Sequence, residues 1–303
     1  MNATVPAALA GERVDRVIAL LTGLPRAEVA VLVAAGAVRV GGRPVVTRSR
    51  RLVEGEDLEV DVPPPVAPEP VSADAGVSVA VVHEDADVVV VDKPAGMVVH
   101  PGAGRESGTL VHGLLARFPE LASVGEPLRP GIVHRLDKGT SGLLAVARSS
   151  AAYRSLVTQL QAHTVERHYL ALAWGRIEAD AGLIDAPVGR GRGDPTRMAV
   201  SASGREARTR YAVVERYGSP AAVTLVECRL ETGRTHQVRV HLAAIGHPLV
   251  GDARYRGSRP VVPAPRPFLH ARHLAFDHPR RGDRLSFESA LPADLAGVLA
   301  GLG

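Results

Sequence analysis

The chain has 303 residues, 46% of them hydrophobic but only 3% aromatic, so its core must rest on aliphatic side chains. The single cysteine, Cys228, excludes an internal disulfide and a metal cluster built from cysteines. The formal net charge of +4 is compatible with an RNA partner without identifying one. The sequence has no recognisable leader and no apolar run approaching about eighteen residues, so we expect a soluble, cytoplasmic protein with no membrane partner.

Residues 12–62 predict a small module of two helices followed by a hairpin and a strand. Apolar residues recur at helical spacing on both sides of Pro25, which is typical of a break between helices. The glycine pair 41–42 predicts a hairpin turn, and residues 58–62 alternate like an exposed strand. The helical residues expected to point inward are Val14, Val17, Ile18, Leu21, Val29, Leu32 and Val33.

This order of elements, with the segment AGAVRVGGRPV at residues 35–45, resembles the S4 RNA-binding domain. The resemblance implies a small S4-like α/β domain whose basic edge meets RNA phosphates, contacts that position RNA without reading its sequence. An ordinary helical hairpin with a solvated charged face is the alternative. The arginines expected to contact RNA are Arg26, Arg39, Arg43, Arg48, Arg50 and Arg51.

Residues 63–72 are rich in proline and predict an extended, semi-rigid linker. A linker of this kind spaces two modules apart instead of letting them pack together. We therefore expect an RNA-binding domain over residues 1–62, a linker over 63–74 and a catalytic domain over 75–303.

Residues 131–148 run from a polar, glycine-rich loop directly into an apolar strand. The run 143–147 has the length of a buried strand, and we expect Gly139 and Gly142 to adopt backbone angles that other residues resist. Asp137 then lies on a tight loop at the edge of a rigid element, where a scaffold can hold a reactive carboxylate. The alternative is an aspartate that ties down its own loop through hydrogen bonds.

The segment HRLDKGTSGLLAVAR, residues 134–148, resembles the HRLDxxTSG motif of the RluA/RluD family of pseudouridine synthases. Residues 225–252 resemble that family's TGRTHQIRVHL motif, residues 88–101 its DKPaGmvvHP element, and residues 268–279 its closing strand. The resemblance spans about residues 75–295. It implies an α+β fold, in which a mixed, mainly antiparallel central sheet is flanked by helices and loops.

The resemblance implies that Asp137 breaks the N1–C1′ bond of uridine, either by attacking C1′ or by removing the 2′ proton. A carboxylate in a closed pocket needs a nearby cation to stay ionised, and the family's matching position assigns this pairing to Arg234. Tyr169 would stack on the extruded base and could take part in proton transfer from C5. No atoms are gained or lost, so we expect no cofactor and no metal.

The resemblance also implies RNA contacts around the cleft. Arg135 would fill the gap left by the extruded base or hold a phosphate, and Leu274 would pack on the base. Lys93 and His100 would border the cleft. With the remaining polar residues of the central motif, the predicted RNA-binding set is His134, Arg135, Lys138, Thr140, Lys93, His100 and Leu274.

The remaining periodic segments predict further elements of the catalytic domain. Strands are expected at residues 79–82, 88–91, 167–175 and 225–230, and helices at 110–117 and 149–161. A helix after residue 235 should turn Val238, Leu242 and Ile245 inward. Residues 186–205 predict a basic hairpin or flexible insertion that could touch RNA, with Arg190, Arg192, Arg197 and Arg205.

Three other readings fail on the sequence. A kinase catalytic loop has no residue between Arg and Asp, a metal site from His236 and His241 would place them on different faces, and no glycosidase carboxylate pair is evident. A non-catalytic RNA-binding or ribosome-assembly factor on the same fold remains the alternative function. We expect a monomeric pseudouridine synthase acting on large-subunit (23S) ribosomal RNA.

Overall fold

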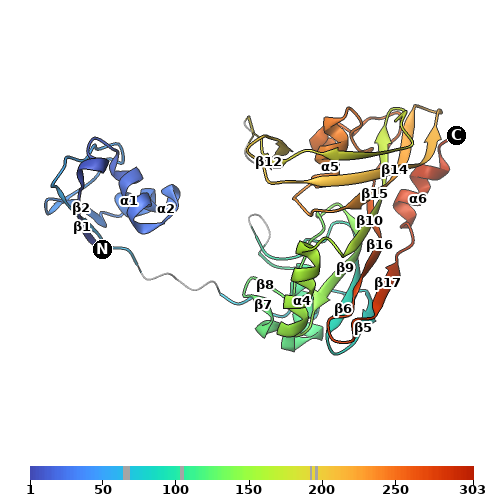
Figure 1. Cartoon of the computed structure of the whole chain (residues 1–303), viewed down its shortest axis with the longest axis horizontal. Helices are drawn as coiled ribbons and strands as arrows, with labels where there is room; N and C mark the ends of the chain where they lie inside the picture. Colours follow the sequence, from blue (N-terminus) through green and yellow to red (C-terminus); the bar gives the residue numbers. More distant parts are fainter. Residues whose placement is uncertain (64–68, 103–105, 192, 195–196) are drawn as a thin grey trace. The chain divides into compact units, whose positions relative to one another are not determined.

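The computed structural model describes residues 1–63, 69–102, 106–191, 193–194 and 197–303. The chain divides into two compact units, Met1–Ala67 and Pro68–Gly303 (Figure 1). The division falls inside the segment predicted as a linker, of which residues 64–68 lie outside the described residues.

The first unit packs two helices on an antiparallel sheet with the strand order β1-β4-β2-β3. Val14, Val17, Ile18, Val29, Leu32 and Val33 are buried as predicted, but Leu21 is 41% exposed because it lies on the outer face of its helix. The elements are β1 (Asn2–Thr4), η1 (Ala7–Leu9), α1 (Val14–Thr22), α2 (Arg26–Ala34), β2 (Val38–Val40), β3 (Arg43–Pro44) and β4 (Asp57–Val60).

Glycine and proline set the boundaries inside this unit. Gly23 ends α1 in the left-handed conformation, with a φ of 73°, and Pro25 caps α2 from an extended conformation. Gly41 and Gly42 both have positive φ, the combination that a two-residue hairpin turn between β2 and β3 requires. The two predicted helices and the predicted β-hairpin are therefore confirmed.

The second unit is built on a mixed sheet with the described strand order β11-β14-β15-β10-β16-β9-β6-β5, and β17 pairs with β16. All of these pairings are antiparallel except that of β16 with β9, so the predicted mixed, mainly antiparallel sheet is confirmed. The strands are β5 (Val81–Glu84), β6 (Val88–Lys93), β9 (Ser141–Ala147), β10 (Glu166–Trp174), β11 (Ala181–Asp185), β14 (Arg208–Tyr217), β15 (Val223–Leu230), β16 (Leu269–Asp277) and β17 (Arg284–Glu288).

Two short hairpins lie outside this sheet. They pair β7 (Gly125–Glu126) with β8 (Arg129–Pro130), and β12 (Val188–Arg190) with β13 (Met198–Val200). The second falls within residues 186–205, where a basic hairpin was predicted. Of its arginines, Arg192 lies outside the described residues.

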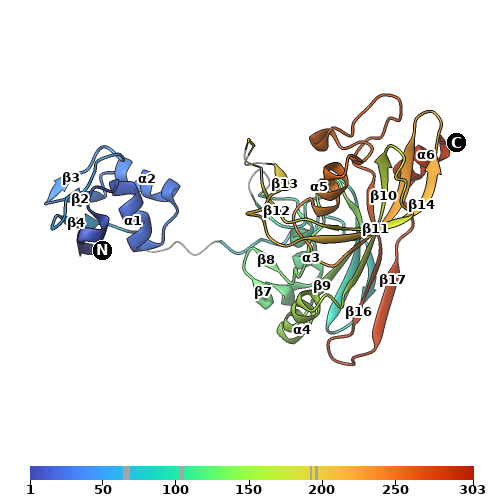
Figure 2. The ribbon, with the colours of Figure 1, turned by 45° about the horizontal axis from the view of Figure 1, so that its top comes forward.

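Helices cover both faces of the sheet. In Figure 2, α3 and α5 lie on one side of it and α6 on the other. Alternate residues of the central strand β10 serve the two sides, with Tyr169 and Ala171 in one core cluster and Leu170 and Leu172 in another. The helices are α3 (Leu110–Arg117), η2 (Pro119–Ser123), α4 (Ser150–Gln161), α5 (Gln237–Ala244), η3 (Ala253–Tyr255) and α6 (Ala293–Ala300).

Helix ends follow the sequence signals closely. Thr109 caps α3 in a capping box with His112, and the side chain of Ser149 caps α4 by accepting from the backbone N–H of Ala152. Val238 turns inward from α5 as predicted, whereas Ile245 is 40% exposed because it already lies at the C-cap.

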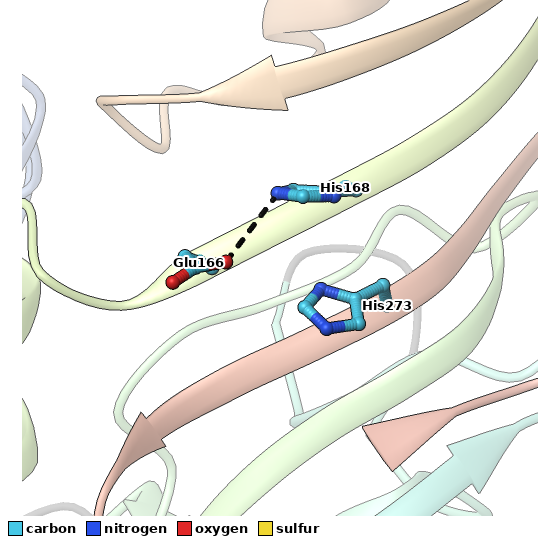
Figure 3. Close-up of side chains that lie close together, drawn as sticks. All are labelled: Glu166, His168 and His273. Carbon is cyan, nitrogen blue, oxygen red and sulfur yellow. Dashed lines mark ion pairs between the residues drawn. The ribbon is translucent and has the colours of Figure 1, made fainter. Parts of the chain in front are cut away.

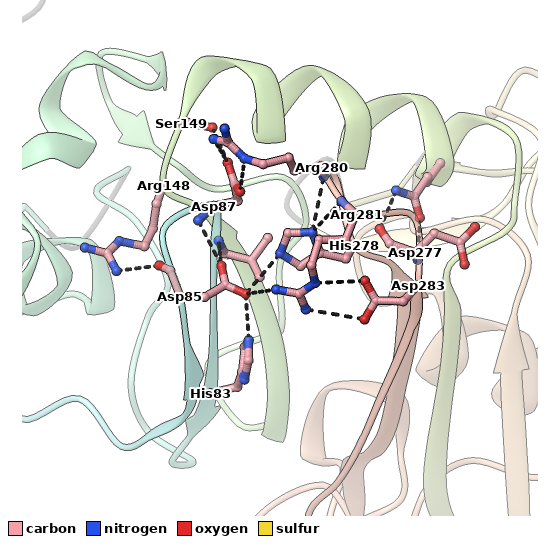
Figure 4. A network of polar contacts seen from close by, with 12 residues as sticks. His83, Asp85, Asp87, Arg148, Ser149, Asp277, His278, Arg280, Arg281 and Asp283 are labelled. Carbon is pink, nitrogen blue, oxygen red and sulfur yellow. Dashed lines mark hydrogen bonds and ion pairs between the residues drawn. The ribbon is translucent and has the colours of Figure 1, made fainter.

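A polar network joins the β5–β6 turn to the loop between β16 and β17 (Figure 4). Asp85 accepts hydrogen bonds from the backbone N–H groups of Asp87 and Val88, and its second oxygen lies 3.0 Å from the Nε2 atoms of both His83 and His278. Burial raises the pKa of Asp85, but these donors outweigh it and hold that pKa well below its ordinary value. The network therefore anchors one end of the sheet.

No single helix in the described part of the chain has the length and hydrophobicity to cross a membrane. Helices α1 and α2 meet that requirement only when taken together, across a bend of 118°.

Candidate active site

The second unit contains a cavity of about 520 Å³ whose walls come from the central motif, from β10 and from the turn before α5. It brings together residues that lie far apart in the sequence. The predicted site residues among its lining are His100, His134, Arg135, Asp137, Thr140, Tyr169 and Arg234.

The loop that carries Asp137 is held from three directions. The N–H of Thr140 donates to the Asp137 carbonyl at 3.0 Å, and the N–H of Gly96 donates to the Lys138 carbonyl at 2.7 Å. Arg266 donates to the Gly139 carbonyl and to the Ser141 hydroxyl, each at 3.1 Å. The carboxylate is therefore presented from a rigid turn at the start of β9.

Gly142 is required where this loop enters β9. Its φ is +113°, and a Cβ atom there would lie 2.2 Å from the carbonyl oxygen of Ala271 on the paired strand β16. Gly139 has no positive φ among the described residues. The prediction of unusual backbone angles is therefore confirmed for Gly142 and wrong for Gly139.

The cation beside the carboxylate is Arg239. Its Nη1 donates to Oδ2 of Asp137 at 3.2 Å, while its Nε and Nη2 donate to the two oxygens of Asp252 at 2.7 and 2.9 Å. Burial lowers the pKa of Arg239, but its bonds to Asp252 and Asp137 give a net increase. The guanidinium is thus a fixed cation, and Asp252 sets its orientation.

The predicted pairing of Asp137 with Arg234 is wrong. Arg234 lines the cavity, but its Nε donates to the carbonyl of Glu206 at 2.9 Å. It lies in the turn before α5, whereas Arg239 lies inside the helix, whose first turn faces the loop of Asp137. The sequence analysis missed Arg239 and Asp252, although both belong to the segment 225–252 that carries the family motif.

His236 is a third residue that the sequence analysis missed, since it was considered there only as a metal ligand. Its Nε2 lies 3.9 Å from Oδ2 of Asp137, and its Nδ1 lies 2.9 Å from the hydroxyl of Tyr255. Burial lowers the pKa of His236 despite the nearby carboxylate. His241 turns elsewhere, with its ring nitrogens 2.9 Å from the Thr209 hydroxyl and from the Ala186 carbonyl.

Tyr169 lines the cavity from β10 and is only 6% exposed. Burial raises the pKa of Tyr169 to about 12, against the opposing effect of Arg167. The phenol therefore keeps its proton at neutral pH, so it can present an aromatic face and a hydrogen-bond donor but not a phenolate base.

Comparisons with known proteins agree with these features. Residues 87–244 match the family model described as RNA pseudouridylate synthase. The chain belongs to this family. The RluA/RluD resemblance is thereby confirmed at the level of the family, and so is the expectation that the protein is an isomerase.

Relatives of the synthase match along nearly its whole length. An uncharacterised RNA pseudouridine synthase, YlyB of Bacillus subtilis (strain 168), is 45% identical over 96% of this chain and 94% of its own. The ribosomal large subunit pseudouridine synthase D of Nitrosomonas europaea is 44% identical over 98% and 86%. Among solved structures, human RNA pseudouridylate synthase domain containing 1 has a TM-score of 0.58 and 30% identity, covering 75% of this chain and 88% of its own.

The synthase keeps His134 neutral in the wall of its cavity. The imidazole Nε2 accepts the backbone N–H of Ala145 at 3.0 Å, which places the proton on Nδ1. Burial, aided by the charge of Arg167, lowers the pKa of His134 to about 3. Within the described residues its Nδ1 is buried without a hydrogen-bond partner.

Two predicted cationic residues of the synthase lie outside the cavity lining. Lys93 is fully buried, and its Nζ donates to the carbonyls of Pro94 and Met97 at 2.8 and 3.0 Å. Burial lowers the pKa of Lys93 to about 8, although the nearby Asp137 opposes the shift. Lys138 is exposed beside Asp137 without lining the cavity.

The prediction that Leu274 packs on the target base is wrong. Leu274 is 1% exposed and belongs to a separate core cluster with Leu156 and Phe276. The residue of the same strand that lines the cavity is Leu269. The two leucines lie five positions apart on β16 and belong to different core clusters, Leu269 with Tyr169 and Leu274 with Leu156.

Proposed function

We propose that this synthase isomerises uridines in large-subunit ribosomal RNA, with Asp137 as the catalytic carboxylate. The observation that carries the proposal is the carboxylate of Asp137 on the cavity wall, tied through one oxygen to Arg239 and facing the same cavity as Tyr169. The names of relatives such as the ribosomal large subunit pseudouridine synthase D of Pseudomonas aeruginosa, 41% identical over 98% of this chain, support the choice of RNA.

The two oxygens of Asp137 have different surroundings. Arg239 and His236 both approach Oδ2, and no described residue donates a hydrogen bond to Oδ1. Oδ1 is therefore the oxygen that would act on the sugar. It either attacks C1′ while uracil leaves with the N1–C1′ electron pair, or removes the 2′ proton as that bond breaks. Uracil then turns and its C5 bonds to C1′, while the bond from Asp137 to C1′ breaks or, on the second route, the proton returns to C2′. The proton on C5 finally passes to N1 of the ring, so no atom is gained or lost.

Tyr169 would receive the extruded uracil. Taking a base out of its stack costs a few kcal/mol, and stacking on an aromatic side chain returns about 1–3 kcal/mol. Because the phenol keeps its proton, Tyr169 is not the base that removes hydrogen from C5. Its part is to hold the ring beside Asp137, with Leu269 on the same cavity wall.

Arg135 is exposed at the cavity and would contact the RNA around the vacated position. His100, His134 and Thr140 line the same cavity, and we assign them to nucleotide binding together with the exposed Lys138. Lys93 is buried and would act through its charge and not by contact. An enzyme on ribosomal RNA would work in the cytoplasm, and we propose that it does so as a monomer.

We propose that the first unit is an S4-like RNA-binding domain. Three of the predicted contacts are already engaged, since Arg26 pairs with Asp15, Arg50 with Glu56, and Arg51 donates to the Gly11 carbonyl. Arg39, Arg43 and Arg48 are exposed and make no ion pair with another described residue. These three are the side chains best suited to neutralise phosphates.

The catalytic role is tested with the Asp137→Asn variant. We expect tritium release from C5-labelled uridine in ribosomal RNA transcripts to fall by at least about a thousandfold, while RNA binding measured by filter retention persists. Asn keeps the shape of the side chain, so the thermal midpoint should change little. Activity within tenfold of the original chain would refute the assignment, and absence of any wild-type activity on ribosomal transcripts would exclude the proposed RNA.

The role of the first unit is tested by changing Arg39, Arg43 and Arg48 together to Gln. Each lost phosphate contact should reduce the slope of log affinity against log salt by about 0.7–0.9. A matched variant, Arg26→Gln with Arg50→Gln and Arg51→Gln, removes three charges that are already engaged within the unit and should change the slope less. Equal slopes in the two variants would contradict the proposed RNA face.

A further inference from the structure

We propose that Glu166, His168 and His273 form a binding site for a divalent transition-metal ion, with Zn²⁺ as its representative. One ligand atom from each side chain lies within 4.8 Å of the others. Figure 3 shows the carboxylate and the two imidazoles converging from neighbouring strands. Two histidines with one carboxylate form a donor set suited to zinc, and the fourth position is left for water.

The strands dictate this convergence. Glu166 and His168 are two positions apart on β10 and therefore share a face. His273 on β16 lies directly opposite His168 in the register, and the two rings stand 4.7 Å apart between centroids. Tyr169 follows His168 and points to the other face, into the cavity. The cluster is thus separate from the catalytic site.

The second nitrogen of each histidine already has a polar neighbour. Nδ1 of His168 lies 3.7 Å from the carboxylate of Glu227, and Nε2 of His273 lies 3.0 Å from the hydroxyl of Ser286. Metal-binding histidines usually have their other ring nitrogen oriented by a carboxylate or another polar group. This leaves Nε2 of His168 and Nδ1 of His273 as the ligand atoms.

The remaining nitrogen of His273 provides the independent sign of a missing partner. Its Nδ1 is buried and has no hydrogen-bond partner among the described residues. A buried polar atom without a partner is unfavourable, and a bound cation would remove that penalty. Glu166 contributes Oε2, which lies 3.8 Å from Nε2 of His168.

The geometry needs only a small adjustment to hold an ion. Ligand atoms of tetrahedral zinc stand about 3.3 Å apart, so the side chains must close slightly from their present separations. The other oxygen of Glu166 is fixed by Arg284 at 2.6 Å, which orients the carboxylate but adds a positive charge nearby. We therefore expect micromolar affinity and not the nanomolar affinity of structural zinc sites.

A second cluster of similar composition does not satisfy these conditions. Asp85, Asp87 and His278 also lie within reach of one another. However, Asp85 already accepts two backbone N–H groups and lies against two histidines, and Asp87 is paired with Arg280 at 2.7 Å. A cation there would have to displace bonds that the sheet end depends on.

The test is calorimetric titration of the metal-free full-length chain with ZnCl₂. We expect one ion per chain, binding at least about 100-fold weaker in His273→Gln, and binding about 10–100-fold weaker in Glu227→Gln, which removes only an orienting group. His83→Gln changes a histidine beside Asp85 that belongs to neither cluster, and this variant should bind like the original chain. Thermal midpoints without metal confirm that each variant is folded.

Titration with Co²⁺ adds a readout that folding cannot imitate, because visible absorption reports the coordination geometry. We expect a tetrahedral spectrum that is lost in His273→Gln and kept in His83→Gln, with wild-type tritium release unchanged by His273→Gln. Absence of stoichiometric binding by the original chain would overturn the proposal. Equal affinity in the original chain and His273→Gln would overturn it as well.

Discussion

Asp85 and Asp137 have similar neighbours but differ in how many of their carboxylate oxygens are hydrogen-bonded. Each lies near arginine and histidine side chains, at the end of a strand of the same sheet. Asp85 has donors on both oxygens, whereas among the described residues only Oδ2 of Asp137 accepts a hydrogen bond, and Asp137 also lines the cavity. A carboxylate whose two oxygens both have hydrogen-bond partners stabilises the fold. A carboxylate that lines a cavity and has only one oxygen engaged is available for chemistry.

Arg239→Lys is expected to have the largest effect on the Asp137 side of this comparison. Lysine keeps the charge but cannot hold Asp137 and Asp252 together through a planar fork. We expect tritium release to fall by about 100-fold and the pH profile of the remaining activity to change. Arg234→Lys is the matched control because it changes the neighbouring cavity arginine, and it should lose less than about tenfold. If Arg234→Lys lost more activity than Arg239→Lys, Arg234 would be the partner of Asp137 instead.

Asp85→Asn should reduce stability and leave the chemistry intact. Loss of a partly buried, multiply bonded carboxylate lowers the free energy of unfolding by about 2–3 kcal/mol. The pKa of Asp85 is lowered in the folded chain, so its stabilisation is present above the ordinary aspartate pKa and is lost as pH falls below it. Urea unfolding at pH 7 and pH 3 measures this, and the difference between variant and original chain should shrink at pH 3. A large loss of tritium release per folded molecule would contradict the contrast.

Substitutions at Tyr169 test whether activity depends on its aromatic ring or on its hydroxyl. We expect Tyr169→Ala to lower tritium release by about 10–100-fold through lost stacking, and Tyr169→Phe by less than about tenfold. The phenol keeps its proton at neutral pH, since burial raises the pKa of Tyr169 to about 12. If Phe were as inactive as Ala, the hydroxyl would carry the function instead.

Lys93 should give the smallest effect, seen in the dependence on pH. Burial lowers the pKa of Lys93 to about 8, so its charge near Asp137 disappears as pH rises through 8. Tritium release should then fall by about two- to fivefold relative to Lys93→Met, which has no such charge. The free energy of unfolding should change in the opposite direction. Between pH 8 and the ordinary lysine pKa only the unfolded chain holds the proton, so the unfolding free energy rises with pH.

Parallel activity and stability profiles for Lys93→Met and the original chain would show that the ammonium does not influence the site. Both proteins are measured on the same RNA at each pH, so that any effect of pH on the RNA itself is the same for the two. The opposite directions expected for activity and stability separate an electrostatic role from a general loss of structure.

Local signals in the sequence determined the elements and singled out the loop of Asp137. Capping residues fixed the starts of α3 and α4, glycine pairs fixed the first hairpin, and apolar runs fixed the central strands, because each signal acts within a few residues. Asp137 was found in the same way, since polar groups and glycines are concentrated in one short stretch.

Only the tertiary structure decided which distant side chains meet. Arg234 and Arg239 belong to one motif, yet only Arg239, inside α5, reaches Asp137, because the helix start and the fixed position of Asp252 direct it there. Leu269 and not Leu274 lines the cavity, because Leu274 packs in the core cluster of Leu156 and Phe276. Helix orientation, strand register and bulges arise from packing between segments far apart in the chain, and no local pattern records them.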